Sequence, residues 1–456
     1  MNFENSNLFR ISIFEFRIFK LSREGEIWFR LCRVGRISMK EVKKLNISKS
    51  LELFGEATKL IPGGVLGARK PSDFIEGEYP IFLENGKGCR LTDVDGNEYI
   101  DFLCGYGPII LGYREEEVDE AVVKQIREKG FCFTLTQRYQ NQLAKKLREL
   151  VPSAEMSIFL KTGSDATTAS IRIARAYTNR IKVMRCGYHG WHDWCVEMKG
   201  GIPEKFYEDV YEFRYNKLDQ LEELMAKYGK ETAAIIITPF GHPNHQKMEE
   251  PQPGFLEGVR EIATRHGAVL VFDEVRTNFR LSMGGAQKLY GVTPDLSVLG
   301  KSMANGYAIS AVSGKREVMM AAAQKLFISS TFFPNSDGYV AALKTIEILE
   351  RDKVIENIWE KGNRFLKKLR NIMSKHDVGA ELTGVAPMFY ITFKKDAAET
   401  HRKRRDDFYT QLIRKGIFLH PHHHGYISYR HTDQDLDLTA QAIDEALAYV
   451  KEKHQK

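Results

Sequence analysis

A short apolar segment that ends in a carboxylate constrains the fold of this chain most strongly. Residues 268–272 are all apolar, follow Gly267 and lead directly into Asp273. Such a run is typical of a strand that is buried on both faces, as in parallel sheets covered by helices. Because ligands of open α/β sheets bind beyond the carboxyl ends of the strands, the sequence predicts that Asp273 lies at a binding site.

Similar apolar runs alternate with helical patterns over much of the chain. Strands are expected at residues 156–160, 181–186, 233–237 and 269–272, and helices at 116–129, 139–150 and 218–228. This alternation predicts an α/β fold with a large domain in which a mostly parallel sheet is flanked by helices. A helix over residues 48–57 and a hairpin over residues 81–100, with turns at Asn85-Gly86 and Asp95-Gly96, are expected in a smaller α+β domain.

The chain is too long for a single lobe. It has 456 residues, of which 43% are hydrophobic, and this exceeds what one compact core holds. The expected divisions are an N-terminal extension at residues 1–38, the first part of the small domain at 39–102, the large cofactor-binding domain at 103–335, and a bridging helix with the small C-terminal domain at 336–456.

Residues 1–38 differ in composition from the rest of the chain. They contain six Phe but no Ala, Pro or Asp, and they hold seven Lys or Arg and four Asp or Glu. They thus carry +3 of the formal net charge of +7, so the remainder is only weakly basic and no nucleic-acid partner is expected. We expect the extension to be poorly ordered and Met39 to be the natural first residue. An accessory helix or a targeting arm is the alternative.

The cysteines show no pattern of pairing or metal binding. There are six, at Cys32, Cys89, Cys104, Cys132, Cys186 and Cys195. Scattered cysteines in a chain of this size indicate a reducing compartment, and the cytoplasm is the expected location. No uninterrupted apolar run approaches the ~18 residues of a membrane span, so no membrane partner is expected.

A lysine provides a second candidate site residue. Lys301 follows Gly300 and the residues 296–299, of which all but Ser297 are apolar. At the end of such a strand its ammonium would be poorly solvated, which lowers the pKa of the amine and makes it a nucleophile for a carbonyl. Together the two residues suggest pyridoxal 5'-phosphate. The lysine would hold the cofactor as a Schiff base and move a proton, while Asp273 would keep the pyridine nitrogen protonated.

A third segment predicts a phosphate site. The expected strand at 156–160 is followed by a turn containing Gly163 and Ser164 and then by a helical pattern. Unpaired N–H groups and the dipole at a helix N-terminus attract an anion such as a phosphate. An ordinary capped helix would have the same sequence pattern.

These motifs, in this order, resemble the class III, fold-type I aminotransferases, and within them the branch similar to glutamate-1-semialdehyde aminomutase. The resemblance covers nearly the whole chain after the N-terminal extension. It rests on Ile61–Val65, Asp93–Asp101, the turn at Gly163-Ser164, Tyr188-His189-Gly190, Asp273-Glu274-Val275, Gly300-Lys301 and His431-Thr432.

The resemblance implies a cofactor role for each matching residue. Lys301 would be the Schiff-base lysine and Asp273 the partner of the pyridine nitrogen, with Val275 against one ring face and Tyr188 stacked on the other. Gly163 and Ser164 would bind the phosphate. Thr331 matches a threonine that reaches the phosphate of the neighbouring subunit, which implies a homodimer with shared active sites.

Two arginines are candidates for binding a substrate carboxylate. A guanidinium forms bidentate pairs with carboxylates, and Arg69 and Arg430 are the two arginines considered for this role. Arg69 stands one residue earlier than the carboxylate-binding arginine of the aminomutase-like branch, and a salt-bridged or solvated role is the alternative for Arg430. The histidine-rich segment 420–424 lacks ligands at the spacing of a zinc site, so no metal is expected.

The sequence also departs from the family pattern. Thr238 stands where Glu is usual, Asp165 also replaces a usual Glu, and residues 302–307 differ from the glycine-rich run of true aminomutases. We therefore expect an aminotransferase that moves an amino group between an amino acid or amine and an oxo compound. The alternatives are the aminomutase, a racemase and a non-catalytic scaffold, and the presence of both Lys301 and Asp273 disfavours the last.

Overall fold

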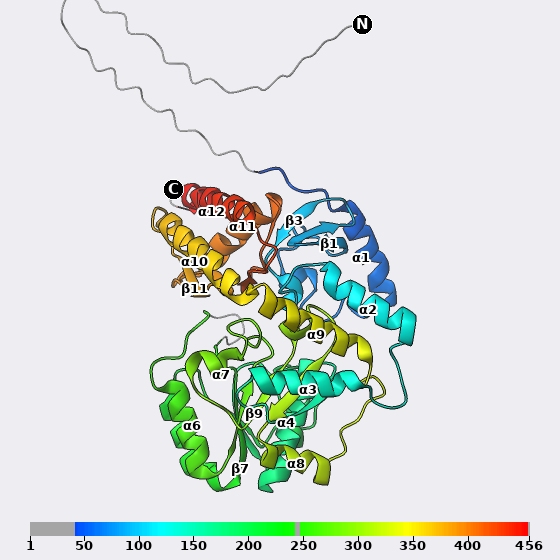
Figure 1. Cartoon of the computed structure of the whole chain (residues 1–456). Coiled ribbons are helices and arrows are strands. Elements are labelled where there is room, and N and C mark those ends of the chain that lie inside the picture. The colour runs from blue at the N-terminus through cyan, green and yellow to red at the C-terminus, as the bar shows by residue number, and fades with distance from the viewer. Residues whose placement is uncertain (1–41, 242–246, 455–456) are drawn as a thin grey trace, which may run out of the picture. The chain divides into compact units, whose positions relative to one another are not determined.

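A seven-stranded sheet lies at the centre of the large part of the chain shown in green in Figure 1. The computed structural model describes residues 42–241 and 247–454, and the expected N-terminal extension lies outside them. In spatial order the strands are β4 (Met156–Leu160), β10 (Ser310–Gly314), β9 (Leu296–Leu299), β8 (Val269–Asp273), β7 (Thr232–Ile237), β5 (Lys182–Cys186) and β6 (Val210–Glu212). The expected mostly parallel sheet is confirmed.

One strand of this sheet runs against the others. β10 pairs antiparallel with both β4 and β9, whereas all other pairs are parallel. As a result β4 and β9 run in the same direction although they are not neighbours. The strands β4, β5, β7, β8 and β9 therefore all end at one edge of the sheet.

Helices cover both faces of the sheet, as its apolar strands require. Successive residues of a strand point to opposite faces. Ile236 packs with α4 (Gly163–Thr178) and α8 (Arg316–Lys325), while its neighbour Ile235 packs with α5 (Leu218–Tyr228) and α6 (Phe255–His266). Every residue of β7 and β8 is buried, which explains why these strands read as continuous apolar runs.

Two smaller sheets lie outside the central one. The first has the order β1 (Leu83–Lys87), β2 (Arg90–Asp93), β3 (Glu98–Asp101), β13 (Ile417–Phe418), and the second has the order β11 (Ala380–Val385), β12 (Met388–Phe393), β14 (Gly425–Tyr426). The remaining helices are α1 (Ser48–Leu60), α2 (Glu116–Lys129), α3 (Arg138–Leu150), α7 (Gly285–Tyr290), α9 (Ser336–Arg351), α10 (Val354–Met373), α11 (Thr400–Arg414) and α12 (Asp433–His454). The domain boundaries at 102/103 and 335/336 stay a prediction.

One turn expected from the sequence is wrong. Asn85 and Gly86 lie inside β1, where they pair with Thr92 and Leu91 of β2. The chain reverses instead after Lys87, at Gly88, whose φ of 61° lies in the left-handed region that glycine adopts without strain. The other turn signal, Asp95-Gly96, does lie between β2 and β3.

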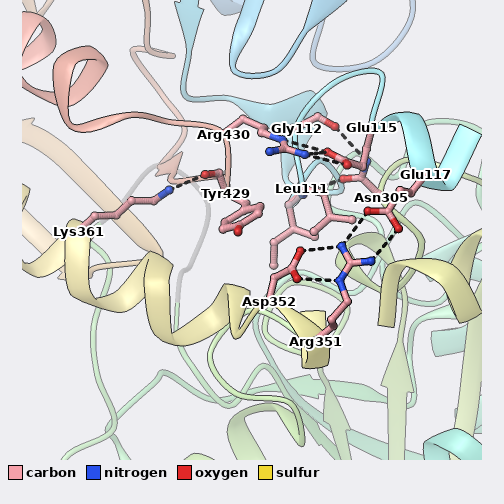
Figure 2. A network of polar contacts seen from close by, with 11 residues as sticks. Leu111, Gly112, Glu115, Glu117, Asn305, Arg351, Asp352, Lys361, Tyr429 and Arg430 are labelled. Carbon is pink, nitrogen blue, oxygen red and sulfur yellow. Dashed lines mark hydrogen bonds and ion pairs between the residues drawn. The ribbon is translucent and has the colours of Figure 1, made fainter. Parts of the chain in front are cut away.

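A buried asparagine ties the segment after Lys301 to a distant part of the chain, as Figure 2 shows. The side-chain Oδ1 of Asn305 accepts hydrogen bonds from the amides of Ile110 at 3.0 Å and Leu111 at 2.9 Å. Its Nδ2 donates to the carbonyl oxygen of Gly112 at 2.9 Å. Asn305 has a φ of 44°, in the left-handed region that asparagine tolerates better than most residues.

Replacing Asn305 with Ala should lower the free energy of unfolding by about 3 kcal/mol, because two buried amides and one carbonyl lose their partner. The matched control is Asn179→Ala, since Asn179 also has a left-handed backbone but is exposed. Chemical denaturation of both variants measures the difference. Equal losses in the two variants would contradict a stabilising role for the buried hydrogen bonds.

Candidate active site

The loops that follow the parallel strands meet at one edge of the central sheet and enclose a cavity of about 320 Å³. β4, β5, β8 and β9 each deliver a group to it, because their carboxyl ends lie at this edge. The cavity is lined by Lys161, Gly163, Ser164, Thr167, Tyr188, His189, Gly190, Asp273, Val275, Arg276, Lys301, Tyr307, Ala308 and Ile309. The structure thus brings together six of the residues predicted from the sequence: Lys301, Asp273, Gly163, Ser164, Tyr188 and Val275.

Lys301 occupies a strained turn after β9. It begins the short 3-10 helix Lys301–Ala304 with a φ of 44°, which is unfavourable for a residue with a side chain. The surroundings hold this conformation. Asn278 Nδ2 donates to the carbonyl oxygen of Gly300 at 3.3 Å, and Arg280 Nη2 donates to Ser302 Oγ at 3.0 Å.

The environment of Lys301 favours its neutral amine. Burial, together with the positive charges of Arg276 and Arg280 and against the opposing effect of Asp273, lowers the pKa of Lys301 to about 7. An unfolded chain keeps this proton up to its ordinary pKa of 10.5. Between about pH 7 and pH 10.5 the unfolded state therefore binds more protons, and this group makes the cofactor-free protein more stable as the pH rises.

Asp273 is held by a histidine that the sequence interpretation did not assign. His189 Nδ1 donates to Asp273 Oδ2 at 2.8 Å, and both side chains are buried. The other carboxylate oxygen accepts from the amide of Val275 at 3.2 Å. These contacts fix a carboxylate in the cavity wall. The position of His189 directly after Tyr188 was the only sequence signal for its role.

The turn after β4 presents helix amides to the cavity. Thr162 caps α4: its Oγ1 accepts from the amide of Asp165 at 3.1 Å, and Asp165 Oδ2 accepts from the amide of Thr162 at 2.8 Å. The first amides of a helix have no partner within it and can bind an anion. Gly163 leaves room for a close approach, since a Cβ there would lie 3.2 Å from both methyl groups of Val275.

The chemistry of this cavity fits pyridoxal phosphate. It combines an amine whose pKa is lowered to about 7, a fixed carboxylate and a helix N-terminus within one space. Tyr188, which is 46% exposed, and Val275 also line it. These are the groups needed for an aldehyde, a pyridine nitrogen, a phosphate and the two faces of a ring.

Three residues predicted for the site do not line this cavity. Arg430 pairs with Glu115 through hydrogen bonds of 2.7 to 3.0 Å, as Figure 2 shows, which matches the salt-bridged alternative. The Arg69 guanidinium lies over the ring of Tyr106, 5.5 Å from its centroid. Thr331 is exposed and lines a separate surface pocket that also contains Phe133.

Further polar residues of the cavity were missed, among them Lys161, Tyr307 and Arg276. Lys161 pairs with Asp337 at 3.5 Å, and Tyr307 donates to Asp119 at 2.8 Å. Arg276 has no such partner among the described residues. Its position next to Val275 in the sequence was the available signal, because a strand end that places Val275 against a ligand also places its neighbour nearby.

The described residues contain no cluster of three or more His, Cys, Asp or Glu side chains that could hold a metal ion. In the histidine-rich segment, His420 Nδ1 accepts from the amide of His422 at 2.9 Å, and His424 contacts the hydroxyl of Tyr426 at 2.7 Å. No helix in the part of the chain that the structure describes combines the length and apolarity of a membrane span.

Comparisons with known proteins agree with this geometry. The family model described as "Aminotransferase class-III" matches residues 74–451. Over 409 residues the chain is 59% identical to 3-aminobutyryl-CoA aminotransferase of Cloacimonas acidaminovorans (strain Evry), covering 90% of this chain and 99% of the relative. It is 33% identical over 429 residues to glutamate-1-semialdehyde 2,1-aminomutase 2 of Brevibacillus brevis, covering 88% and 99%.

A solved structure that contains PLP also matches most of the chain. The chain resembles the PLP form of the FumI protein from Sphingopyxis sp. MTA144 with a TM-score of 0.84 and 30% sequence identity. The match covers 89% of this chain and 97% of the FumI chain.

Amine modification of the cofactor-free protein should show Lys301 reacting half-maximally near pH 7, since burial and the neighbouring arginines lower its pKa to about that value. Exposed lysines react with a midpoint near ~10.4. Peptide mass spectrometry across a pH series measures both. In Asp273→Asn the midpoint of Lys301 should fall, because a negative charge that raises its pKa is removed. A midpoint near pH 10 would contradict the assignment.

Proposed function

The chain belongs to the class-III aminotransferase family and is a pyridoxal-phosphate-dependent aminotransferase, and from this premise we propose that its amino donor is a 3-aminoacyl thioester represented by 3-aminobutyryl-CoA. The observation that carries the proposal is the 59% identity, over 99% of its length, to a relative named for that activity. The relatives named as aminomutases are 31% to 35% identical. Thr238 stands where the family usually has Glu, and residues 302–307 differ from the glycine-rich run of true aminomutases, and both departures favour a substrate other than that of the aminomutase.

We propose that the cavity groups divide the work of amino transfer among them. When bound, pyridoxal phosphate supplies an electron sink beside the carbon that carries the amino group. Lys301 holds the cofactor and moves the proton at that carbon, which its low pKa suits it to do at neutral pH. Asp273, oriented by His189, keeps a proton on the ring nitrogen.

The remaining cofactor contacts are proposed from the positions of the residues around the cavity. The amides of Gly163 and Ser164 at the start of α4 neutralise the phosphate. Tyr188 and Val275 pack against the two ring faces and exclude water from the reacting carbon.

We also propose that two copies of the chain form a homodimer with shared active sites. Several large apolar side chains near Thr331 are exposed: Phe327 is 82% exposed and Phe332 59%. Leu135 directly follows Phe133 and Thr134, which line the same surface pocket as Thr331, and it is 79% exposed. Exposed apolar groups that lie together mark interaction surfaces. Burying them in a dimer would let Thr331 reach the phosphate site of the partner.

The cytoplasm is the proposed location. The structure describes five of the cysteines, and all five are free thiols. Four of these are buried, so their reduced state is part of the packed fold. Unpaired buried cysteines in a large chain are typical of a reducing compartment.

In Asp273→Asn the ring nitrogen loses its anionic partner, and we expect kcat to fall on the order of 10²-fold or more. Steady-state kinetics with saturating cofactor measures this. The control is Asp295→Asn, because Asp295 is a buried carboxylate paired with Arg260 and Lys315 at the opposite edge of the sheet. That variant should lose stability but keep kcat. Near-normal turnover in Asp273→Asn with cofactor bound would remove Asp273 from this role.

The donor is tested by giving the cofactor-loaded enzyme 3-aminobutyryl-CoA alone. A transaminase should bleach the absorbance band of the cofactor and release about one equivalent of 3-oxobutyryl-CoA, because the first half-reaction of a ping-pong mechanism ends there. Adding an oxo acid should restore the band and start turnover.

Three other results would replace the proposal. Continued conversion of glutamate-1-semialdehyde to 5-aminolevulinate without an added oxo acid would identify an aminomutase. Loss of stereochemical purity of the donor without an oxo product would identify a racemase. Bleaching by free amino acids but not by the thioester would keep the aminotransferase and reject the thioester as donor.

A further inference from the structure

Arg276 is a charged residue of the cavity that forms no ion pair with any residue the structure describes. It follows Val275 and lines the cavity together with Asp273 and Lys301. Its Nη2 is shielded from solvent and has no hydrogen-bond partner. Within residues 42–241 and 247–454, no carboxylate forms an ion pair with it. Unsatisfied buried donors cost free energy that a ligand restores, so the guanidinium is poised to bind an acceptor.

The other charged groups of the cavity already have a partner in the protein or a proposed role in the reaction. Lys161 pairs with Asp337 at 3.5 Å, and Asp273 accepts from His189 at 2.8 Å. Lys301 is the reacting amine. Among these groups, Arg276 therefore has donors left for the part of a substrate that does not react.

The charge of Arg276 reaches the groups around the reacting amine. It lowers the pKa of Lys301 more than any other neighbouring charge does, and it acts in the same direction on Tyr188 and on Tyr426. The guanidinium and the amine of Lys301 line the same cavity, so one ligand in that cavity can contact both groups.

Arg280, the other guanidinium near Lys301, is built differently. It is fully buried, donates to the carbonyl oxygen of Gly107 and to Ser302 Oγ, and lies 4.5 Å from the centroid of the Tyr426 ring. It does not line the cavity. Its contacts support the turn of Lys301, which leaves ligand binding to Arg276.

We propose that Arg276 determines donor specificity by binding the acyl oxygen of the substrate. In a 3-aminoacyl donor the acyl carbon stands two carbons along from the carbon that carries the amine. A guanidinium offers several N–H donors in a fixed plane and binds a neutral carbonyl oxygen or a carboxylate. The inference rests on the proposed donor class, and it adds the group by which this cavity recognises that class.

The test uses Arg276→Met and Arg276→Lys in the cofactor-loaded enzyme, with the exposed Arg370→Met on α10 as a control. Donors are 3-aminobutyryl-CoA, 3-aminobutyrate and 2-aminobutane, which has the same carbon skeleton without an acyl oxygen. In Arg276→Met, kcat/KM for the two acyl donors should fall roughly 10- to 100-fold, while 2-aminobutane should change less than about threefold. Arg276→Lys should lie between, and Arg370→Met should match the wild type.

A binding measurement separates recognition from turnover. Butyrate and butyryl-CoA carry the acyl oxygen but no amine, so they bind without reacting. Calorimetric titration should show their Kd rising in Arg276→Met by about the same factor as kcat/KM falls, with the absorbance band of the cofactor unchanged.

Two outcomes would overturn the inference. One is an equal loss for all three donors together with a shifted cofactor band, which would assign Arg276 to the cofactor. The other is an unchanged kcat/KM for the acyl donors. If the wild type uses 3-aminobutyrate but not the thioester, the proposed thioester donor fails, yet the comparison with 2-aminobutane still decides the role of Arg276.

Discussion

The common direction of four strands is the constraint on which the active site depends. β4, β5, β8 and β9 all end at one edge of the central sheet, although β4 and β9 are separated by β10. All residues of β8 and β9 and four of the five residues of β5 are buried, so a shift of register would displace side chains that are packed in the core. Packing in the hydrophobic core thereby fixes the positions of His189, Asp273 and Lys301 and of the turn at Gly163 and Ser164.

The cavity wall and the residues directly behind it contain two groups that are individually unfavourable. Lys301 has a left-handed backbone and a desolvated amine, and Arg280 is a fully buried cation whose described contacts include no carboxylate. Such groups persist only where the surroundings over-determine them. Asn278 and Asn305 donate to main-chain carbonyl oxygens around this turn, and Arg280 donates to the carbonyl oxygen of Gly107 and to the hydroxyl of Ser302. The strain is concentrated around the amine of Lys301.

Much of this arrangement could be predicted from the sequence, because both the fold and the main cofactor groups have local signals. The apolar runs located the strands, and their ends located Asp273 and Lys301. The strand order and the antiparallel β10 could not be predicted, since pairing depends on contacts far apart in the chain. Asn85-Gly86 was misplaced because a turn dipeptide also fits within a strand. His189 and Asn305 bind partners that are far away in the sequence, and Arg276 meets the other cavity residues only in the folded chain, so a single sequence does not display these contacts.

The antiparallel strand β10 sets the distance between the ends of β9 and β4, and with it the length of a ligand that reaches both. Neighbouring strands of any sheet lie ~4.8 Å apart, and β10 separates the strand that leads to Lys301 from the strand that leads to the amide turn. The two anchoring points are thus held two spacings, roughly 10 Å, apart before the reach of the side chains is counted. A molecule must carry its aldehyde and its anionic end at matching separation to use both. The width of one inserted strand thus sets the length of a ligand that can reach both Lys301 and the start of α4, and the backbone pairing of β10 with β4 and β9 fixes that width.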